Sequence, residues 1–321
     1  MTSPPTVSVV IPVRNEWTHL GAVLDAVLAQ DYEGPIEIVV ADGGSTDGTR
    51  ALLDARAGDD PLIRVIDNPG TTAAAGLNLA IAASSGEIIV RCDGHAEFSA
   101  GYIRTAVEVL TATGAANVGG VQAAEGERLV QQAIAIAMTS PLGVGNSRFH
   151  YSSAAGAADT VYLGTFDRES LEEVGGFDER LLRNQDYELN HRLRAAGKVV
   201  WFDPRLRVTY RPRATLGTLW RQQMDYGRWK RTMLRRSPDA LKARQLAPPL
   251  LVLGLMASVI LIAASQPVGL SLPVVYGTFL VLGTIGEGLR RRHVAALLLP
   301  VVLAVMHLAW GYGFLFGRAR L

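Results

Sequence analysis

The C-terminal part of this 321-residue chain is almost entirely apolar, and this feature restricts the possible folds more than any other. From Leu246 onward the only acidic residue is Glu287, and three apolar stretches follow one another: Leu246–Ala264, Val268–Ile285 and Val294–Phe316. Each is close to the about 20 residues that a helix needs to cross the hydrocarbon core of a bilayer. A hairpin of buried soluble helices is the alternative, but such helices normally carry a polar face, which these stretches lack. We therefore expect residues 246–321 to form a transmembrane region of three helices.

Basic residues flank these stretches unevenly. One basic cluster precedes the first stretch and Arg290–Arg292 separate the second from the third, whereas Ser265–Pro267 carry no charge. The first cluster consists of Arg231, Arg235, Arg236, Lys242 and Arg244. Because basic residues favour the cytoplasmic side, the pattern places residues 1–245 in the cytoplasm and predicts a multi-pass protein of the cell (plasma) membrane. With three spans, Arg318 and Arg320 would lie on the non-cytoplasmic side, which basic residues disfavour. Two spans therefore remain the alternative to three.

Charge and cysteine content restrict the partners and the compartment. The formal net charge is +1, which gives no reason to expect nucleic acid as a partner. The single cysteine, Cys92, excludes an internal disulfide and fits a reducing compartment. Both observations agree with a cytoplasmic location for residues 1–245.

The N-terminal part of the chain alternates strand and helix patterns. Runs of β-branched residues, which are typical of strands, occur at residues 7–12, 36–41, 63–66 and 88–90. Apolar residues at helical spacing separate them, such as Leu20, Val23, Leu24 and Val27 after the first run. Strands that alternate with helices predict an α/β fold with a Rossmann-like, mostly parallel sheet flanked by helices.

Polar residues follow two of the expected strands directly. Asp42 ends the second run, and Asp93, Gly94 and His95 come shortly after the fourth. Ligands of open α/β sheets sit outside the carboxyl ends of the strands, so these side chains stand where a ligand would be held. Asp93 and His95 are alternate residues, which share one side of an extended segment, and both can therefore face one metal ion. Asp42 suits an acceptor for a base or a ribose, while a polar turn and a helix-capping acid remain the structural alternatives.

A dinucleotide-binding fold would also place an acid at the end of the second strand, where it holds a ribose. Such folds bind the pyrophosphate through the pattern Gly-x-Gly-x-x-Gly in the first loop. The first loop of this chain, Pro12–Glu16, contains no glycine. The sequence therefore argues against a dinucleotide site.

Two later helices carry further candidates. Asp186 falls in the first turn of a helix that we expect to end near Gly197. The helix dipole favours an ionised group there, which suits a carboxylate that accepts a proton, although ordinary helix capping is the alternative. Residues 215–236 predict a basic and aromatic helix, including Arg228 and Trp229, of the kind found at lipid headgroups. Arginines on this helix could also hold a diphosphate.

Six motifs follow one another along the chain: Pro12–Glu16, Asp42–Asp47, Asp93–His95, Gly175–Glu179, Gln185–Glu188 and Gln223–Trp229. Their order resembles that of the family 2 inverting glycosyltransferases, which have a GT-A fold. Within that family the chain is most similar to membrane-attached, succinoglycan-type exopolysaccharide glycosyltransferases. The resemblance covers residues 6–235 and lies in the ordered set, because each motif alone is weak.

The resemblance implies a role for individual residues. It implies a nucleotide site at Pro12, Arg14, Glu16 and Asp42. Asp93 and His95 would bind a divalent metal, Mn²⁺ or Mg²⁺, on the donor diphosphate, with His95 in place of the second acid of the family's Asp-x-Asp. Asp93 would thereby contribute to donor binding. Gln223, Arg228 and Trp229 are only loosely similar to the Gln-x-x-Arg-Trp motif of processive synthases, because their spacing is longer. Asp186 would be the catalytic base, beside Gln185 where family members carry a glutamate.

Together these observations predict a cytoplasmic GT-A catalytic domain at residues 1–214, an amphipathic interfacial helix with a linker at residues 215–245, and the transmembrane region. The expected activity is transfer of a sugar from a nucleotide-sugar donor, a UDP-sugar in the first instance, to a lipid-linked or polysaccharide acceptor at the membrane lipid surface. One alternative is a nucleotidyltransferase, which usually needs a glycine-rich first loop with a basic residue. The other is a membrane protein that binds nucleotide sugars without catalysis.

Overall fold

The computed structural model describes residues 3–145, 147–236 and 238–318. The chain forms two compact units. The first, which we call the sheet unit, comprises Met1–Ala123 and Ser152–Tyr210; the second, the helical unit, comprises Ala124–Tyr151 and Arg211–Leu321. Residues 124–151, which the sequence places in the catalytic domain, thus group with the helices that follow residue 210. The functional domain boundaries given above stay a prediction.

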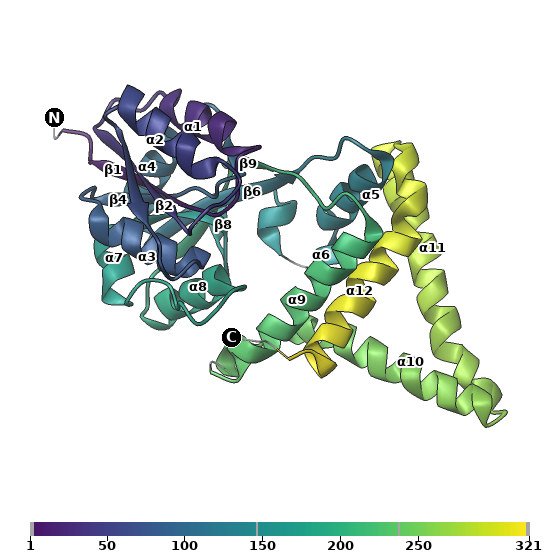
Figure 1. Cartoon of the computed structure of the whole chain (residues 1–321). Helices are drawn as coiled ribbons and strands as arrows, with labels where there is room; N and C mark the ends of the chain where they lie inside the picture. Colours follow the sequence, from purple (N-terminus) through teal and green to yellow (C-terminus); the bar gives the residue numbers. More distant parts are fainter. Residues whose placement is uncertain (1–2, 146, 237, 319–321) are drawn as a thin grey trace. The chain divides into compact units, whose positions relative to one another are not determined.

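One mixed sheet of nine strands forms the centre of the sheet unit, in the order β3-β2-β1-β4-β8-β6-β9-β5 with β7 paired to β9 (Figure 1). The strands are β1 (Val7–Val13), β2 (Ile36–Asp42), β3 (Ile63–Asp67), β4 (Ile88–Arg91), β5 (Glu97–Phe98), β6 (Asn117–Ala124), β7 (Gly156–Ala157), β8 (Tyr162–Asp167) and β9 (Val200–Tyr210). The pairs β1–β2, β2–β3 and β1–β4 are parallel, whereas β4–β8, β6–β8, β5–β9 and β7–β9 are antiparallel. The expected α/β sheet with flanking helices is therefore present, and its parallel strands are confined to one half.

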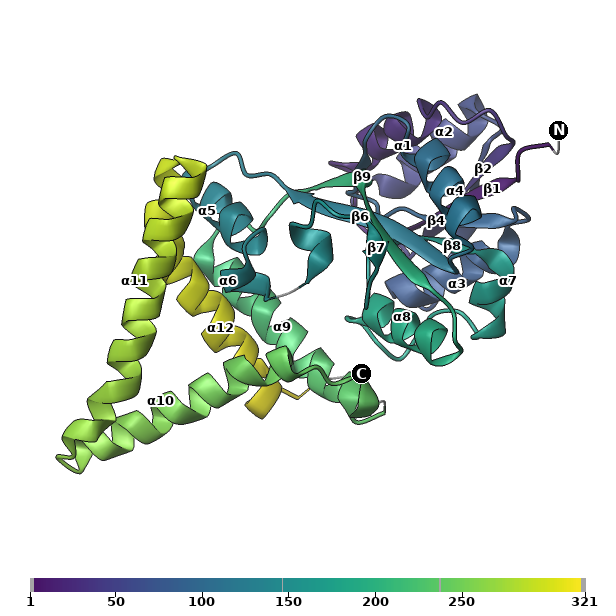
Figure 2. The same cartoon turned by 180° about the vertical axis from the view of Figure 1, so that it is seen from behind.

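Helices cover both faces of this sheet (Figures 1 and 2). They are α1 (Leu20–Leu28), α2 (Thr49–Asp59), α3 (Ala73–Ala83), α4 (Tyr102–Thr113), α7 (Arg168–Glu173) and α8 (Gln185–Ala195). Because helices lie on both sides of the sheet, every residue of β1 is buried, as is typical of strands in parallel sheets. Its alternate residues, such as Val9 and Ile11, join a core cluster with Leu20 and Leu24 of α1 and Ile103 of α4.

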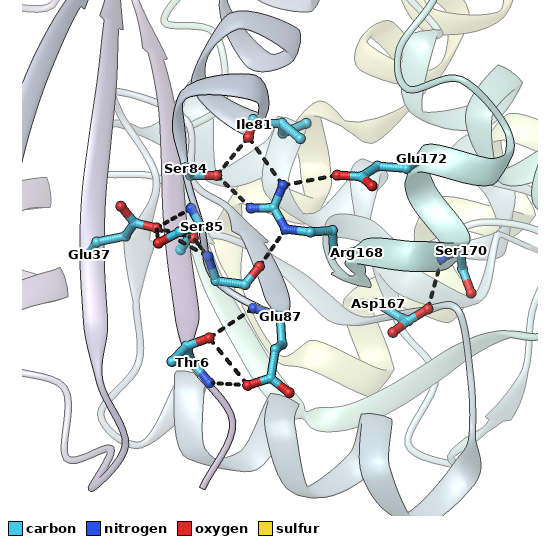
Figure 3. A network of polar contacts seen from close by, with 12 residues as sticks. Thr6, Glu37, Ile81, Ser84, Ser85, Glu87, Asp167, Arg168, Ser170 and Glu172 are labelled. Atoms are coloured by element: carbon cyan, nitrogen blue, oxygen red, sulfur yellow. Dashed lines mark hydrogen bonds and ion pairs between the residues drawn. The ribbon is translucent and has the colours of Figure 1, made fainter.

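Polar contacts fix the chain just before β4, the strand that leads to the candidate site (Figure 3). The Arg168 guanidinium donates to the Gly86 carbonyl at 2.5 Å and to the Ser84 hydroxyl at 2.8 Å. On the other side, Glu37 Oε1 accepts from the Ser85 amide at 2.5 Å and from the Ser8 hydroxyl at 2.7 Å. These bonds tie the start of β4 to β2 and to the first turn of α7.

A Glu37→Gln variant is expected to lower the free energy of unfolding by about 1–3 kcal/mol, because hydrogen bonds to a charged acceptor are replaced by bonds to a neutral one. Burial alone would raise the pKa of Glu37, but the bonds from Ser85, Ser8 and Gly86 lower it below the ordinary value. A lowered folded-state pKa stabilises the fold above the unfolded-state value and loses this effect as the pH falls through the folded-state pKa. Thermal unfolding in detergent should therefore show a gap between wild type and variant at pH 7 that closes below about pH 4. The exposed control Glu33→Gln should show no gap.

The helical unit contains α5 (Leu129–Met138), α6 (Pro141–Val144), α9 (Leu216–Leu234), α10 (Ala247–Ala263), α11 (Ser271–Arg291) and α12 (Leu299–Phe316). Three helices of the described chain are long and apolar enough to cross a membrane: Ala243–Ala263, Pro267–Arg291 and Val294–Phe316. The expectation of three apolar helices is confirmed. The second helix continues past its expected end because Glu287 is paired with Arg290 and Arg291, at 2.7 and 3.1 Å.

The expected interfacial helix is α9, and it packs along α12 (Figures 1 and 2). Their backbones touch at two glycines: a Cβ atom added to Gly227 would lie 2.1 Å from the Trp310 carbonyl oxygen, and one added to Gly313 would lie 2.2 Å from that of Met224. Small residues permit such close approach of apolar helices. Arg231 adds a hydrogen bond of 2.7 Å to the Leu315 carbonyl. The basic helix α9 thus packs directly against α12, the helix of the third apolar stretch.

Candidate active site

The candidate residues of the sheet unit lie where parallel strands end. Val13 at the end of β1 is in register with Asp42 at the end of β2, and Val10 is in register with Arg91 at the end of β4. The three loops that leave these strands therefore start from one edge of the sheet. This edge is where ligands of open α/β sheets bind.

Asp42 organises the first two of these loops. It is 4% exposed, and its Oδ1 accepts from the Ser45 hydroxyl at 2.6 Å. Ser45 in turn accepts from the Asn15 amide at 2.9 Å, and Asn15 Oδ1 accepts from the Thr46 amide at 2.8 Å. The Asp42–Asp47 motif and the Pro12–Glu16 motif are thus locked together. Asn15 adopts a positive φ of 57°, a conformation that asparagine tolerates better than most residues.

The predicted nucleotide residues differ in how accessible they are. Pro12 is buried within β1, whereas Arg14 is exposed and Glu16 is partly exposed. Pro12 packs against α3, where a Cβ atom added to Gly76 would lie 3.2 Å from the Pro12 Cβ. The Pro12 side chain therefore supports the loop from the buried side, whereas the side chains of Arg14 and Glu16 lie at the surface.

The Asp93–His95 segment is a turn and not an extended strand end. The Ala96 amide donates to the Asp93 carbonyl at 2.9 Å, which closes the turn. The expectation that the two side chains share one side of an extended segment is therefore wrong. Gly94 allows the turn to pack on β1, because a Cβ atom there would lie 3.0 Å from side-chain atoms of Glu16 and Val13. As a result His95 Nδ1 lies 2.9 Å from Glu16 Oε1.

Arg91 lies at the centre of the site. Its Nε is 2.9 Å from Asp93 Oδ1, and its Nη1 is hydrogen-bonded to Asp186 Oδ1. The arginine is 4% exposed, and its guanidinium carbon lies 5.7 Å from the centre of the Phe177 ring. Burial alone would lower the pKa of Arg91, but the charges of Asp186 and Asp93 raise it above the ordinary value. The two carboxylates, 93 residues apart in the chain, thus meet on one buried cation.

Arg91 was not among the predicted site residues, although the sequence carries a signal for it. The residue ends an otherwise apolar buried run, Ile88–Val90, and stands two positions before Asp93. A charge inside a buried strand requires a partner of opposite sign. An arginine at this position therefore indicates nearby carboxylates, although the sequence does not say which ones.

Asp186 lies in the first turn of α8, as expected. Its side chain is 36% exposed, so one side of the carboxylate is open to solvent. Burial raises the pKa of Asp186, Arg91 opposes this, and the Asp93 charge adds to the rise. The net shift is upward. For Asp93 burial also raises the pKa, but Arg91 brings it below the ordinary value.

The loop after α7 closes the site around Arg91. Phe177 is held by Asn78, whose Oδ1 accepts from the Phe177 amide and whose Nδ2 donates to the Phe177 carbonyl, both at 2.9 Å. Glu188 pairs with Arg192 at 2.7 Å, and Arg192 donates to the Gly176 carbonyl at 2.6 Å. Glu188 therefore supports this loop and does not contact Arg91 in any described interaction.

Asp93 keeps acceptor positions that suit a divalent cation. A carboxylate accepts at about four lone-pair positions, so the bonds from Arg91 leave room for a cation on Asp93. Within the described residues no group of three histidine, cysteine or acidic side chains is arranged to hold a metal. Magnesium-like ions commonly bind through one or two protein ligands and complete their shell with phosphate oxygens and water. The residues present therefore suit a cation that arrives with a diphosphate.

Arg228 lies on α9 in the helical unit, where it forms an ion pair of 3.0 Å with Asp225. The other predicted site residues lie in the sheet unit. The role of Arg228 in diphosphate binding stays a prediction.

The chain is similar to proteins of known family. Residues 8–174 match the family described as Glycosyl transferase family 2. The chain is 32% identical to the succinoglycan biosynthesis protein ExoA of Rhizobium meliloti (strain 1021), over 95% of this chain and 93% of that protein. It is 24% identical to the dolichyl N-acetyl-alpha-D-glucosaminyl phosphate 3-beta-D-2,3-diacetamido-2,3-dideoxy-beta-D-glucuronosyltransferase of Methanococcus voltae, over 98% of this chain and 97% of that protein.

The fold is also found in a solved structure. The mannosyltransferase PcManGT from Pyrobaculum calidifontis, solved in complex with GDP-Man and Mn²⁺, superposes with a TM-score of 0.66 at 21% sequence identity. The match covers 98% of this chain and 88% of that protein. It confirms the GT-A type of fold expected from the motifs. The family match over residues 8–174 and the near full-length similarity to ExoA show that the chain belongs to glycosyl transferase family 2 and is a glycosyltransferase.

Proposed function

We propose that the protein transfers a sugar from a nucleotide-sugar donor to a hydroxyl group of a lipid-linked or polysaccharide acceptor, with inversion at the anomeric carbon. The observation that carries the proposal is the pairing of Asp93 and Asp186 with the same guanidinium. The pairing places Asp93, which suits a metal-bound diphosphate, beside Asp186, whose pKa is raised. Two carboxylates in such different environments can serve donor binding and proton transfer, respectively. The names of two relatives support the acceptor class: one refers to succinoglycan biosynthesis and the other to a dolichyl phosphate-linked sugar.

In this proposal the first two loops hold the nucleotide. Asp42, the exposed Arg14 and the partly exposed Glu16 face it, and Pro12 supports their loop. Asp93 and His95 hold the diphosphate end of the donor. A divalent cation bound there, Mn²⁺ or Mg²⁺, would neutralise the charge that develops on the departing diphosphate.

Asp186 then acts on the acceptor. Its carboxylate accepts the proton of the attacking hydroxyl group, while the hydroxyl oxygen forms a bond to the anomeric carbon. The bond between that carbon and the diphosphate oxygen breaks on the opposite face, and the nucleoside diphosphate leaves with the electron pair. A single displacement of this kind inverts the configuration and needs no covalent intermediate, in contrast to retaining glycosidases.

We further propose that residues 246–321 attach the enzyme to the cell membrane, with residues 1–214 as the cytoplasmic catalytic domain and residues 215–245 at the lipid surface. Three apolar helices and the basic residues before the first of them support this orientation. A hydrophobic carrier of the acceptor would then lie in the same bilayer as the enzyme.

The test is a screen of UDP-, GDP- and dTDP-sugars with the full chain in detergent, with Mn²⁺ or Mg²⁺. The proposal expects metal-dependent release of one nucleoside diphosphate and a product of inverted anomeric configuration by NMR. Release of pyrophosphate from a nucleoside triphosphate and a sugar phosphate would instead indicate a nucleotidyltransferase. Binding of nucleotide sugars without turnover on any lipid-linked or polysaccharide acceptor would indicate a non-catalytic binding protein.

The pH dependence of kcat/KM follows from the ionisation of the base, Asp186. Asp186 must be ionised, and its pKa is raised, so activity should fall on the acid side at a pH above the value of about 3.9 of an ordinary aspartate. Asp93 has a lowered pKa and stays ionised over the same range. A pH–rate profile should therefore show an acid limb. A flat rate profile down to pH 4 would contradict the assignment of the base.

A further inference from the structure

Arg91 takes part in no step of the proposed reaction, yet three of its nitrogens bond the two carboxylates at the site. It bonds Asp93 through two nitrogens, Nε at 2.9 Å and Nη2 at 3.3 Å, and Asp186 through a third, Nη1. A guanidinium is planar and presents its donors in a fixed fork, so it sets the relative orientation of the two groups that it binds. No other type of side chain can hold two carboxylates in this way.

The arginine itself is held firmly. Its backbone is the last residue of β4, in register with Val10 of β1, and the following amide, that of Cys92, donates to the Val10 carbonyl at 3.0 Å. Phe177 lies against the guanidinium, and Asn78 fixes the Phe177 backbone at both its donor and its acceptor. The side chain is 5% exposed, so it has little freedom to follow either carboxylate if that group moves.

Without this cation the two acids would disturb one another. Asp93 and Asp186 both bond one guanidinium, and two ionised carboxylates that share one cation repel each other once that cation is removed. Loss of Arg91 would therefore leave the distance between the donor diphosphate and the base no longer fixed. Misplacement of a reacting group by about 1 Å can cost about 10²-fold in rate.

We propose that Arg91 is a positioning residue of the transfer reaction: it fixes the base Asp186 relative to the diphosphate-binding carboxylate Asp93. The inference rests on the proposed function, because it assigns Arg91 a task only if Asp186 is the base. It concerns the chemical step and not donor affinity. Arg91 therefore acts on kcat through Asp186, and it does not itself touch the acceptor or the sugar.

The test uses Arg91→Lys and Arg91→Met in the full chain in detergent. Lysine keeps the charge but not the fork, so kcat should fall by about 10–100-fold while the donor KM changes by less than about threefold. Methionine also removes the charge, and kcat should fall by about 10³-fold. Binding of a nucleoside diphosphate with Mn²⁺, measured by calorimetry, should stay within about threefold of wild type for Arg91→Lys.

Arg168→Met is the matched control for a purely structural loss. Arg168 is also a largely buried arginine of the sheet unit, with bonds to Gly86, Ser84 and Glu172, and it lies at the other end of β4. It should lower the unfolding temperature without changing kcat of the folded protein. If Arg91→Lys likewise loses only stability and keeps the wild-type kcat, the inference is overturned. If Arg91→Met does not fold, the kcat of Arg91→Lys by itself tests the inference.

A double-mutant cycle separates this inference from the proposed function. Residues that act as a unit show non-additive effects, so Arg91→Lys should lower the residual rate of an Asp186→Asn enzyme by less than about twofold. A further loss of about 10-fold or more would show that Arg91 acts independently of Asp186 and would overturn the inference. If Asp186→Asn alone keeps the wild-type rate, the base assignment itself fails. If Asp186→Asn is inactive and Arg91→Lys is not impaired, only the positioning role of Arg91 fails.

Discussion

An Asp186→Asn enzyme is expected to lose about 10²–10⁴-fold in kcat, the range that a general base contributes, and to keep its affinity for the nucleoside diphosphate. Asparagine has nearly the same shape as aspartate and retains an oxygen toward Arg91, so the site should stay assembled. It cannot accept the proton of the acceptor hydroxyl. Steady-state transfer rates and calorimetric binding of the nucleoside diphosphate with Mn²⁺ measure the two properties separately.

Glu173→Gln is a suitable control for this experiment. Glu173 is an exposed carboxylate of the same unit, paired with Lys198 at 2.6 Å, and its loss should leave the rate unchanged. Transfer at the wild-type rate by Asp186→Asn would mean that another group takes the proton. A parallel loss of nucleotide binding would mean that Asp186 serves the donor and not the acceptor.

Replacement of Asp93 by asparagine should cost about 10²–10³-fold in kcat/KM, because the diphosphate charge is then poorly compensated as it departs. The same variant should bind the nucleoside diphosphate with an affinity that no longer responds to Mn²⁺. Titration of the metal at fixed nucleotide, followed by calorimetry, measures this response. The loss of metal response distinguishes Asp93 from Asp186, whose variant keeps it.

Asp203→Asn tests whether any lost buried carboxylate produces the same result. Asp203 is 5% exposed and paired with Arg205 at 2.9 Å, so its removal should lower the unfolding temperature but leave the metal response intact. If the nucleotide affinity of the Asp93→Asn enzyme still responds to Mn²⁺ as in wild type, then a residue other than Asp93 binds the metal. His95 would then be the first residue to examine, because it lies in the same turn and contacts Glu16.

Much of the candidate site follows from local sequence patterns. β-branched runs indicate where β2 and β4 end, and the apolar spacing around Leu189 indicates where α8 begins. Asp42, at the end of β2, and Asp186, in the first turn of α8, were therefore predicted at element boundaries from sequence alone. Such boundaries depend on residues close together in the chain, which is why a sequence pattern can locate them.

Other features depend on contacts between distant segments. The pairing of Arg91 with Asp186 joins residues 95 positions apart, and the antiparallel half of the sheet requires β4 to pair with β8. The turn at Asp93–His95 forms where an extended segment was expected, because the Ala96 amide bonds back to the Asp93 carbonyl and Gly94 packs on β1. Neither hydrophobic period nor turn propensity specifies these partners.

By itself, the sequence determined the alternation of strands and helices, the three apolar helices and the ordered motifs of family 2, because each depends on local composition and spacing. The tertiary structure alone decided that one buried arginine holds Asp93 and Asp186 together, and that residues 124–151 pack with the apolar helices. The physical reason is that a buried charge must find a partner, and only the folded backbone determines which carboxylates come within reach.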